Sequence, residues 1–191
     1  MRKSKREAAA TRESILRAAS REFRKNGIVA TGLTELMQSA GLTTRGGFYK
    51  HFESKDQLVA EAAATALDCV VAEMKTNSAE SGGGIDALLA SYLCERHRDN
   101  PQDGCALGAI GSEFARADAH TRDIVTDGFR RMTEVMASQF KGVGKAEARD
   151  RALFYISAMI GAITMSRVVS DRELSRKVLQ ATRHALAHQT I

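Results

Sequence analysis

A segment early in the chain, TGLTELMQSAGLTTRGGFYKHFESK, has the pattern of two short helices joined by a glycine turn. Its first half, residues 33–40, carries apolar side chains at the period of one buried helix face, and Gly41 supplies the free φ that ends such a helix. Thr43 or Thr44 can cap the next helix, on which Phe48 would face inward. The spacing therefore predicts a helix-turn-helix.

The outward face of the second helix would be cationic and rich in hydrogen-bond donors. A helix fits the major groove of B-DNA, where Arg or Lys can pair with guanine, and amides at a helix start can hold phosphate. Two glycines lower helix stability by about 1 kcal/mol each but would let the backbone approach DNA closely. The alternative is a glycine loop with a solvated cationic face. We expect direct DNA contacts from Arg45, Tyr49, Lys50 and His51, with Thr34, Thr44, Gly46, Gly47 and Lys55 supporting them or holding phosphate.

The distribution of charge supports a DNA-facing surface at this end of the chain. Residues 1–60 hold 12 Lys and Arg against 6 Asp and Glu, whereas residues 61–191 hold 16 against 17. A basic N-terminal arm can also act as a solubilising tail. Confinement of the excess charge to the helix-turn-helix segment favours binding to phosphate, with an affinity that falls steeply with salt.

The composition argues against secretion, a membrane span and a metal site. The basic run at residues 2–6 lacks the apolar core of a signal peptide, and the apolar stretch 152–169 is interrupted by polar residues, as in a buried helix. Cys69, Cys94 and Cys105 show no CxxC spacing and no nearby paired His. We expect a cytoplasmic protein with reduced thiols, no membrane segment, no metal and no cofactor.

The rest of the chain is helical in composition, and the expected fold is all-α with about nine helices. No segment alternates as a strand does, and the chain contains one proline. We predict a three-helix DNA-binding domain, residues 1–53, and a six-helix effector-binding and dimerisation domain, residues 54–191. In the first part of the chain, helices are expected over about 11–26 and 33–40, from about residue 44, and from a Ser54–Gln57 capping box to Met74. Further helices are expected over 85–93, 105–117, 119–140, 145–170 and 172–188. A linker is expected at 78–84 and a loop at Pro101.

The predicted helix 145–170 is apolar almost all round in its middle, so a monomer of this size can cover only part of its surface. Small residues at Ala158, Gly161 and Ala162 would let another helix approach closely. A helix pair from each of two subunits would form a four-helix bundle, which predicts a homodimer through residues 145–188. The alternative is a core helix that packs only within its own subunit.

No catalytic constellation is visible, because the five histidines are scattered and no serine lies in a nucleophile-elbow pattern. Met and aromatic side chains of the helical body could instead line an effector pocket. Each of them, taken singly, is also a plausible core residue. The candidates are Tyr92, Cys105, Phe114, Phe129, Met132, Met136, Tyr155 and Met159.

Cys105 begins a predicted helix in the sequence GCALGAIGSE, where free amides and the helix dipole could stabilise a thiolate. The alternative is a small buried residue at a helix start. The sequence leaves two other classes of function open. One is a thiol-dependent enzyme that uses Cys105, and the other is a small-ligand carrier that does not bind DNA.

The helix-turn-helix segment resembles the N-terminal domain of TetR/AcrR-family transcriptional repressors. The resemblance implies a dimer formed by the last two helices, a palindromic double-stranded operator, and release by a small-molecule or reactive electrophile effector. The surroundings of Cys105 are similar to those in a subset that includes the electrophile-responsive repressor of N-ethylmaleimide reductase. Tyr49 follows Gly41 by eight positions, one more than is usual in the family. The matching residues are Phe23, Gly27, Thr31, Leu33, Gly41, Gly46, Phe48, Tyr49, His51, Phe52, Ser54 and Lys55.

Overall fold

The computed structural model describes residues 5–42, 45–79 and 84–188 of the chain, and over these ranges every regular element is a helix. This confirms the expected all-α fold. The elements are α1 (Lys5–Asn26), α2 (Leu33–Ser39), the 3-10 helix η1 (Arg45–Lys50), α3 (Lys55–Ala79), α4 (Gly84–Tyr92), α5 (Glu95–Asp99), the 3-10 helix η2 (Pro101–Asp103), α6 (Ala106–Phe114), α7 (Ala119–Ala137), α8 (Lys145–Val168) and α9 (Arg172–Ala187).

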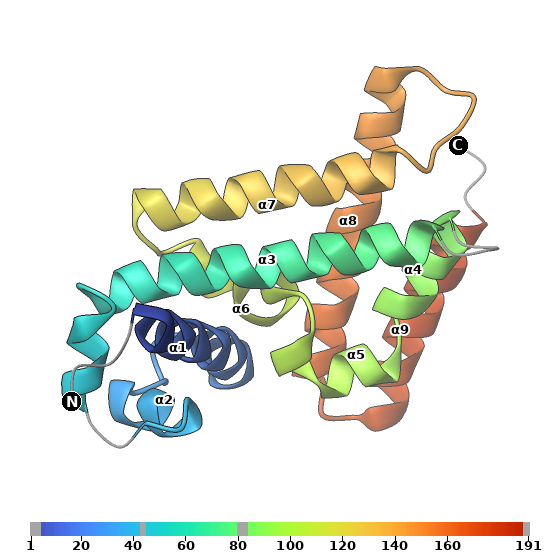
Figure 1. Cartoon of the computed structure of the whole chain (residues 1–191). Coiled ribbons are helices and arrows are strands. Elements are labelled where there is room, and N and C mark those ends of the chain that lie inside the picture. Colours follow the sequence, from blue (N-terminus) through green and yellow to red (C-terminus); the bar gives the residue numbers. More distant parts are fainter. Residues whose placement is uncertain (1–4, 43–44, 80–83, 189–191) are drawn as a thin grey trace.

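The long helix α3 runs across the molecule beside α7, and α8 crosses behind both with α9 packed along it (Figure 1). Helices α1 and α2 lie together at one end, below the first half of α3. The short elements α5 and η2 connect the two ends, because α5 contacts α8 and η2 contacts α1.

Two clusters of buried side chains hold this arrangement together. The first joins α3, α4, α7, α8 and α9 around residues such as Leu67, Leu89 and Met132. The second lies under the predicted helix-turn-helix and contains Phe23 and Phe48. Helices α3 and α6 also contribute to this second cluster, so the N-terminal helices share their core with the body of the molecule.

Several predicted helix ends are confirmed by backbone geometry. Gly27 and Gly41 follow α1 and α2 with φ of 89° and 76°, the left-handed conformation that glycine adopts without strain. Ser54 caps α3, because its hydroxyl accepts a hydrogen bond of 3.0 Å from the Gln57 amide. The Gln57 side chain completes the box one residue earlier than in the standard motif, accepting from the amide of Glu53 at 2.7 Å.

The first helix begins at Lys5, so its predicted start near Thr11 is wrong. The Thr11 hydroxyl does not cap a new helix but donates to the carbonyl of Glu7 at 2.8 Å, within a continuous helix. The predicted linker also begins too early, since Ser78 and Ala79 belong to α3. Residues 80–83 of that linker lie outside the described ranges.

The second helix of the predicted helix-turn-helix forms the 3-10 helix η1 where an α-helix was predicted. Gly46 and Gly47 lower the helical propensity of this six-residue stretch, and short weak stretches commonly take the 3-10 form. Helix α6 is shorter than predicted and kinked, with non-helical angles at Ile110, a position that two glycines flank. The helix α5, residues 95–99, was not predicted, and α7 ends at Ala137 rather than Phe140.

None of the helices in the described ranges has an apolar stretch long enough to cross a bilayer.

Candidate functional site

The η1 segment is fixed from below by two aromatic side chains and presents two polar side chains to solvent. Phe48 and Phe52 are buried and stack at a ring-centroid distance of 5.6 Å. Tyr49 is 66% exposed, with its ring edge-on to Phe48 at 5.1 Å, and Lys50 is also exposed. The i, i+4 aromatic pair therefore holds η1 on the core and directs Tyr49 and Lys50 outward.

The other predicted DNA-contacting residues occupy different positions. Thr34 is exposed near the start of α2, and His51 is partly buried. Arg45 and Gly46 belong to the backbone of η1, whereas Thr44 lies outside the described residues.

Gly47 and Lys55 have structural roles that their sequence pattern did not indicate. A Cβ atom at Gly47 would lie 3.3 Å from the Met37 methyl, so this glycine allows η1 to pack closely on α2. The Lys55 ammonium donates to the carbonyls of Ile28 and Thr31 at 2.6 and 2.8 Å. It ties the start of α3 to the loop that precedes α2.

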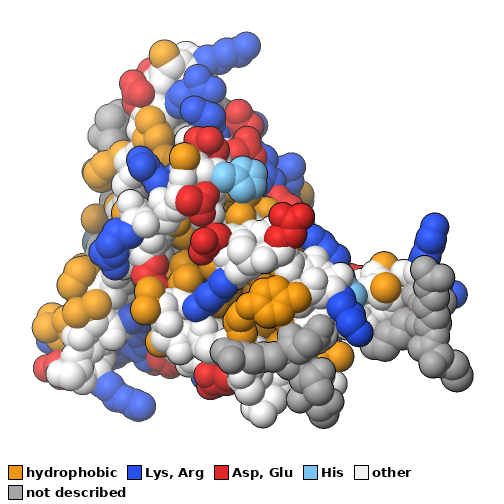
Figure 2. Space-filling model, turned by 90° about the vertical axis from the view of Figure 1, so that its left-hand side faces the viewer, with side chains coloured by type: hydrophobic (Ala, Val, Ile, Leu, Met, Phe, Trp, Pro, Cys, Tyr) orange, Lys and Arg blue, Asp and Glu red, His pale blue; other side chains and the backbone are white. Residues whose placement is uncertain are grey.

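Figure 2 faces the end of the molecule that carries these residues. Lys and Arg side chains are spread over this face, with Asp and Glu side chains among them. This face of the molecule therefore carries charge of both signs.

A cavity of about 330 Å³ lies in the body between α3, α4, α5, η2 and α8. Three of the predicted pocket residues, Tyr92, Cys105 and Met159, are part of its wall. The others lie elsewhere: Met132, Met136 and Tyr155 are buried in the main core, Phe129 packs against that core, and Phe114 belongs to the core under the helix-turn-helix.

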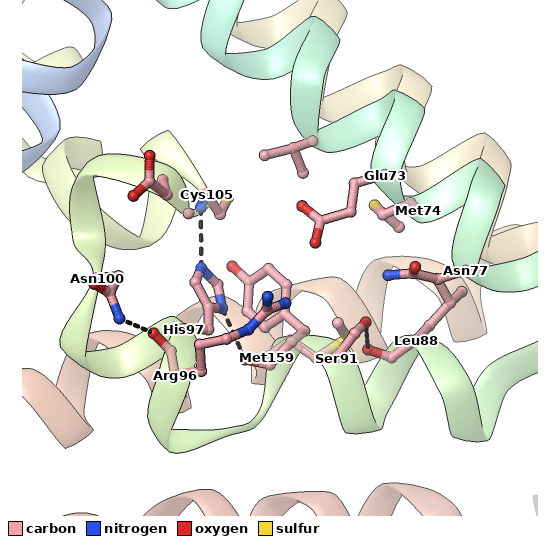
Figure 3. Close-up of a pocket in the computed structure, with 14 residues that line it drawn as sticks. Glu73, Met74, Asn77, Leu88, Ser91, Arg96, His97, Asn100, Cys105 and Met159 are labelled. Carbon is pink, nitrogen blue, oxygen red and sulfur yellow. Dashed lines mark hydrogen bonds between the residues drawn. The ribbon is translucent and has the colours of Figure 1, made fainter.

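Polar residues that the sequence did not single out complete the cavity wall. They include Glu73 and Asn77 of α3, Arg96 and His97 of α5, and Asp103 of η2. Figure 3 shows Glu73 and Arg96 reaching into the space between α3 and the α4–α5 connection. These residues come from three separate stretches of the chain, 73–77, 96–97 and 103, and share no motif, so only the fold brings the three stretches together.

His97 organises one side of the cavity (Figure 3). Its Nδ1 donates to the carbonyl of Tyr92 at 2.7 Å, because a carbonyl can only accept, and its Nε2 accepts from the Cys105 amide at 3.0 Å. Burial lowers the pKa of His97 to about 4, so the ring is neutral near pH 7. No sequence pattern predicted that this histidine would lie beside Cys105.

Cys105 is 1% exposed and occupies the position immediately before α6. Both nitrogens of its neighbour His97 are engaged with backbone groups, so the imidazole has no free lone pair for the thiol proton. No group of three or more residues within the described ranges could hold a metal ion.

The cavity wall is also bonded to the N-terminal helices. Arg24 of α1, 9% exposed, donates to the carbonyl of Gly104 at 2.6 Å, and Arg21 forms an ion pair with Asp103. The Asp103–Cys105 turn therefore borders the cavity on one side and holds α1 on the other.

A second bonded link starts from α6. The carboxylate of Glu113 accepts from the amides of Ile28 and Val29 at 2.9 and 3.0 Å. These amides belong to the loop between α1 and α2, so α6 fixes the position of the helix-turn-helix.

Helix α8 carries exposed apolar side chains on the surface of this single subunit. Phe154 and Met165 are 48% and 47% exposed, and Val168 is 66% exposed. Gly161, one of the predicted small residues, lies on the exposed side, whereas Ala162 is buried. A large apolar area on one helix is typical of a surface that another protein covers.

Comparisons with known proteins match both parts of the chain. Residues 15–62 match the family described as bacterial regulatory proteins, tetR family, and residues 82–181 match the family described as transcriptional regulator LmrA/YxaF-like, C-terminal domain. The transcriptional regulator LmrA of Bacillus subtilis is 26% identical over 162 residues, which cover 82% of this chain and 86% of LmrA.

One further relative and one solved structure extend the comparison. The transcriptional repressor BepR of Brucella suis is 51% identical over 55 residues, which cover 29% of this chain and 26% of BepR. The reduced form of NemR from E. coli has a TM-score of 0.74 at 17% identity, covering 92% of this chain and 94% of NemR. At that identity the second likeness shows a common fold only.

Proposed function

Because this chain belongs to the tetR family of bacterial regulatory proteins, with an LmrA/YxaF-like C-terminal domain, we propose that it is a repressor that binds a palindromic operator as a dimer and is released by an effector. The chain belongs to the class of helix-turn-helix transcriptional regulators. In our proposal residues 1–53 bind DNA, and residues 54–191 bind the effector and form the dimer.

The proposed DNA-binding role rests on one observation, which side chains of η1 are buried and which are exposed. Buried Phe48 and Phe52 hold this element in place while Tyr49 and Lys50 extend into solvent. We assign direct DNA contacts to Arg45, Tyr49, Lys50 and His51. Thr34 and Thr44 would hold phosphate, and Lys55 would support the site through its bonds to the preceding loop.

The proposed dimer uses α8 and α9, within residues 145–188. The exposed apolar side chains of α8 support this assignment, because burying them against a second copy would remove them from water. Two-fold symmetry then matches a palindromic operator, with recognition elements in successive major grooves about 34–36 Å apart.

The cavity supports release by an effector, with Tyr92, Cys105 and Met159 as contacts. Its wall includes the Asp103–Cys105 turn, which also bonds to Arg21 and Arg24 of α1. An effector that prefers a shifted turn would favour an arrangement of the DNA-binding helices that does not fit the operator.

The geometry gives little support to a thiol-dependent enzyme. The Cys105 thiol is buried, and both nitrogens of His97 are bonded to the backbone, so no base is available from that residue. A ligand carrier without DNA binding does not account for the exposed η1.

Alanine substitutions in η1 test the proposal. The operator is first obtained by selecting duplexes from a random library with the wild-type protein. We expect Tyr49→Ala and Lys50→Ala to weaken binding by at least tenfold at fixed salt, as expected for loss of a contact worth about 1–3 kcal/mol. Lys75→Ala, which removes an exposed lysine near the end of α3, is the matched control and should bind normally.

Each variant is compared in a salt-controlled shift assay after its dimer content has been checked by sedimentation. Wild-type affinity should fall steeply as salt increases. Undiminished affinity of both η1 variants, or failure of the wild-type protein to select any duplex, would contradict the proposal.

A further inference from the structure

Three polar side chains of the cavity wall have no partner within the described ranges. Glu73 and Asn77 lie one turn apart on α3, and Arg96 belongs to α5. None of these three side chains forms a hydrogen bond or an ion pair with a described residue. A carboxylate, a carboxamide and a guanidinium are therefore available to a ligand, and together they offer both donors and acceptors.

Other polar groups of the wall are already engaged. Both nitrogens of His97 are bonded to backbone groups, and Asp103 forms an ion pair with Arg21 of α1. The Tyr92 hydroxyl is shielded from solvent and lies beside Gly108 of α6, so it is not presented to a ligand. Recognition of a charged ligand therefore falls to the carboxylate on α3 and the guanidinium on α5.

These two unpaired charges have opposite sign and reach into the cavity from different elements, Glu73 from α3 and Arg96 from α5 (Figure 3). The α5 side is the more positive, because three arginines add to burial in lowering the pKa of His97, namely Arg167, Arg96 and Arg24. An anion drawn to Arg96 would be repelled by Glu73, and a cation drawn to Glu73 would be repelled by Arg96. Only a ligand that carries both charges is attracted at both positions.

The rest of the cavity can cover an apolar group. Its apolar surface comes from Val70, Met74, Leu88 and Met159. Methionine side chains adapt to groups of different shape. The volume of about 330 Å³ is at the lower end of the range for small-ligand sites, which suits a compact ligand with one ring system.

We propose that the cavity binds a compact apolar zwitterion, of which an aromatic amino acid is the simplest example. The ammonium group of this ligand donates to Glu73, its carboxylate accepts from Arg96, and its ring lies against the apolar surface. Asn77 can bond to either charged group. The inference rests on the proposed function in that this compound would be the effector.

Four indole probes that differ only by deletion of charged groups test this assignment. Tryptophan is the zwitterion, indole-3-propionate lacks its ammonium group, tryptamine lacks its carboxylate, and 3-ethylindole lacks both. The chain contains no tryptophan, so the fluorescence of the probe reports binding to the full-length protein directly. The wild-type protein should bind tryptophan at least about fivefold more tightly than each of the others, as expected for one partly exposed ion pair.

Glu73→Gln and Arg96→Gln separate the two charged contacts. Glu73→Gln should lose the preference for tryptophan over indole-3-propionate and keep the preference over tryptamine. Arg96→Gln should show the reverse pattern, because it removes the partner of the carboxylate. A residue that only maintained the shape of the cavity would change the affinity for all four probes alike.

Lys75→Gln is the matched control. It removes a charge from α3 two residues from Glu73, but Lys75 is exposed and does not line the cavity. This variant should keep all the wild-type preferences. Glu73 and Arg96 are also exposed, so all three variants should fold, which circular dichroism checks before binding is measured.

The inference is overturned if the wild-type protein binds none of the probes, or if any other probe binds as tightly as tryptophan. It is also overturned if either cavity variant keeps the wild-type preferences or changes the affinity for all four probes alike, or if Lys75→Gln alters the preferences as much. Binding to the selected duplex is measured separately. A protein that prefers tryptophan but binds no DNA would contradict the proposed function and leave this site assignment standing.

Discussion

At the scale of single residues, His97 connects two backbone segments through one neutral ring. It bonds to the carbonyl of Tyr92 at the end of α4 and to the amide of Cys105 at the start of α6. A protonated ring would have to give up the bond from the Cys105 amide, because Nε2 would no longer carry a lone pair. The local structure therefore favours the neutral form.

This preference predicts a pH-dependent stability. The pKa of His97 is about 4 in the folded protein against about 6.5 for an unperturbed histidine, so the unfolded chain takes up a proton first as the pH falls. The contribution of the neutral His97 ring to the free energy of unfolding should be complete above pH 6.5. It should be lost between about pH 6.5 and 4, and the loss should amount to at most about 3 kcal/mol.

Urea unfolding at several pH values measures this effect in the wild-type protein and in His97→Gln, which cannot titrate there. The free energy of unfolding should fall less steeply over this window in the variant. Equal slopes for the two proteins would show that His97 is not held neutral by the fold.

Individual roles in the helix-turn-helix could be predicted where they follow from helical spacing. The inward positions of Phe48 and Phe52 and the exposure of Tyr49 were expected and are confirmed. The bonds of Lys55 to two carbonyls depend on a loop 24 to 27 residues away, which no local pattern encodes. The meeting of Glu73, Arg96 and His97 in one cavity likewise depends on tertiary packing.

At the scale of elements, the Asp103–Cys105 turn between η2 and α6 connects the cavity with α1. The carbonyl of Gly104 accepts from Arg24, and the Asp103 carboxylate pairs with Arg21. A Cβ atom at Gly104 would lie 2.3 Å from the His97 ring, so an added methyl group must displace either the ring or the turn.

Gly104→Ala should therefore weaken operator binding without any effector, by roughly tenfold for a coupling of 1–3 kcal/mol. Gly111→Ala is the control, because a Cβ atom at Gly111 of α6 meets nothing within 4 Å. Both variants are compared with the wild-type protein on the selected duplex, at a temperature where all are folded by circular dichroism. Identical affinities of the two variants would show that the turn does not position the DNA-binding helices.

The existence of most long helices followed from the sequence, because apolar periodicity and capping residues act locally. Their ends were less predictable. The Thr11 hydroxyl could have capped a helix or bonded within one, and only the structure distinguishes the two. The 3-10 form of η1 was not predicted, because the low helical propensity of its two glycines weakens an α-helix without selecting the 3-10 form.

At the scale of the whole molecule, we propose that a second copy of the chain buries the exposed apolar side chains of α8. Phe154→Glu would place an unpaired charge in the proposed interface, and we expect it to weaken dimerisation by at least a hundredfold, about 3 kcal/mol. Sedimentation should show a monomer at concentrations where the wild-type protein and Lys75→Glu are dimers. A dimer in all three proteins would exclude this face of α8 from the interface.

In the proposed complex, two copies of η1, related by two-fold symmetry, enter successive major grooves. Hydroxyl-radical footprinting on the selected operator detects this arrangement. We predict two protected patches on one face of the duplex, centred about 10 base pairs apart. Inserting about half a helical turn between the half-sites should abolish tight binding, and Tyr49→Ala should remove both patches together. A single protected patch, or a footprint that survives the insertion and the Tyr49 substitution, would show that two copies of η1 do not occupy successive major grooves.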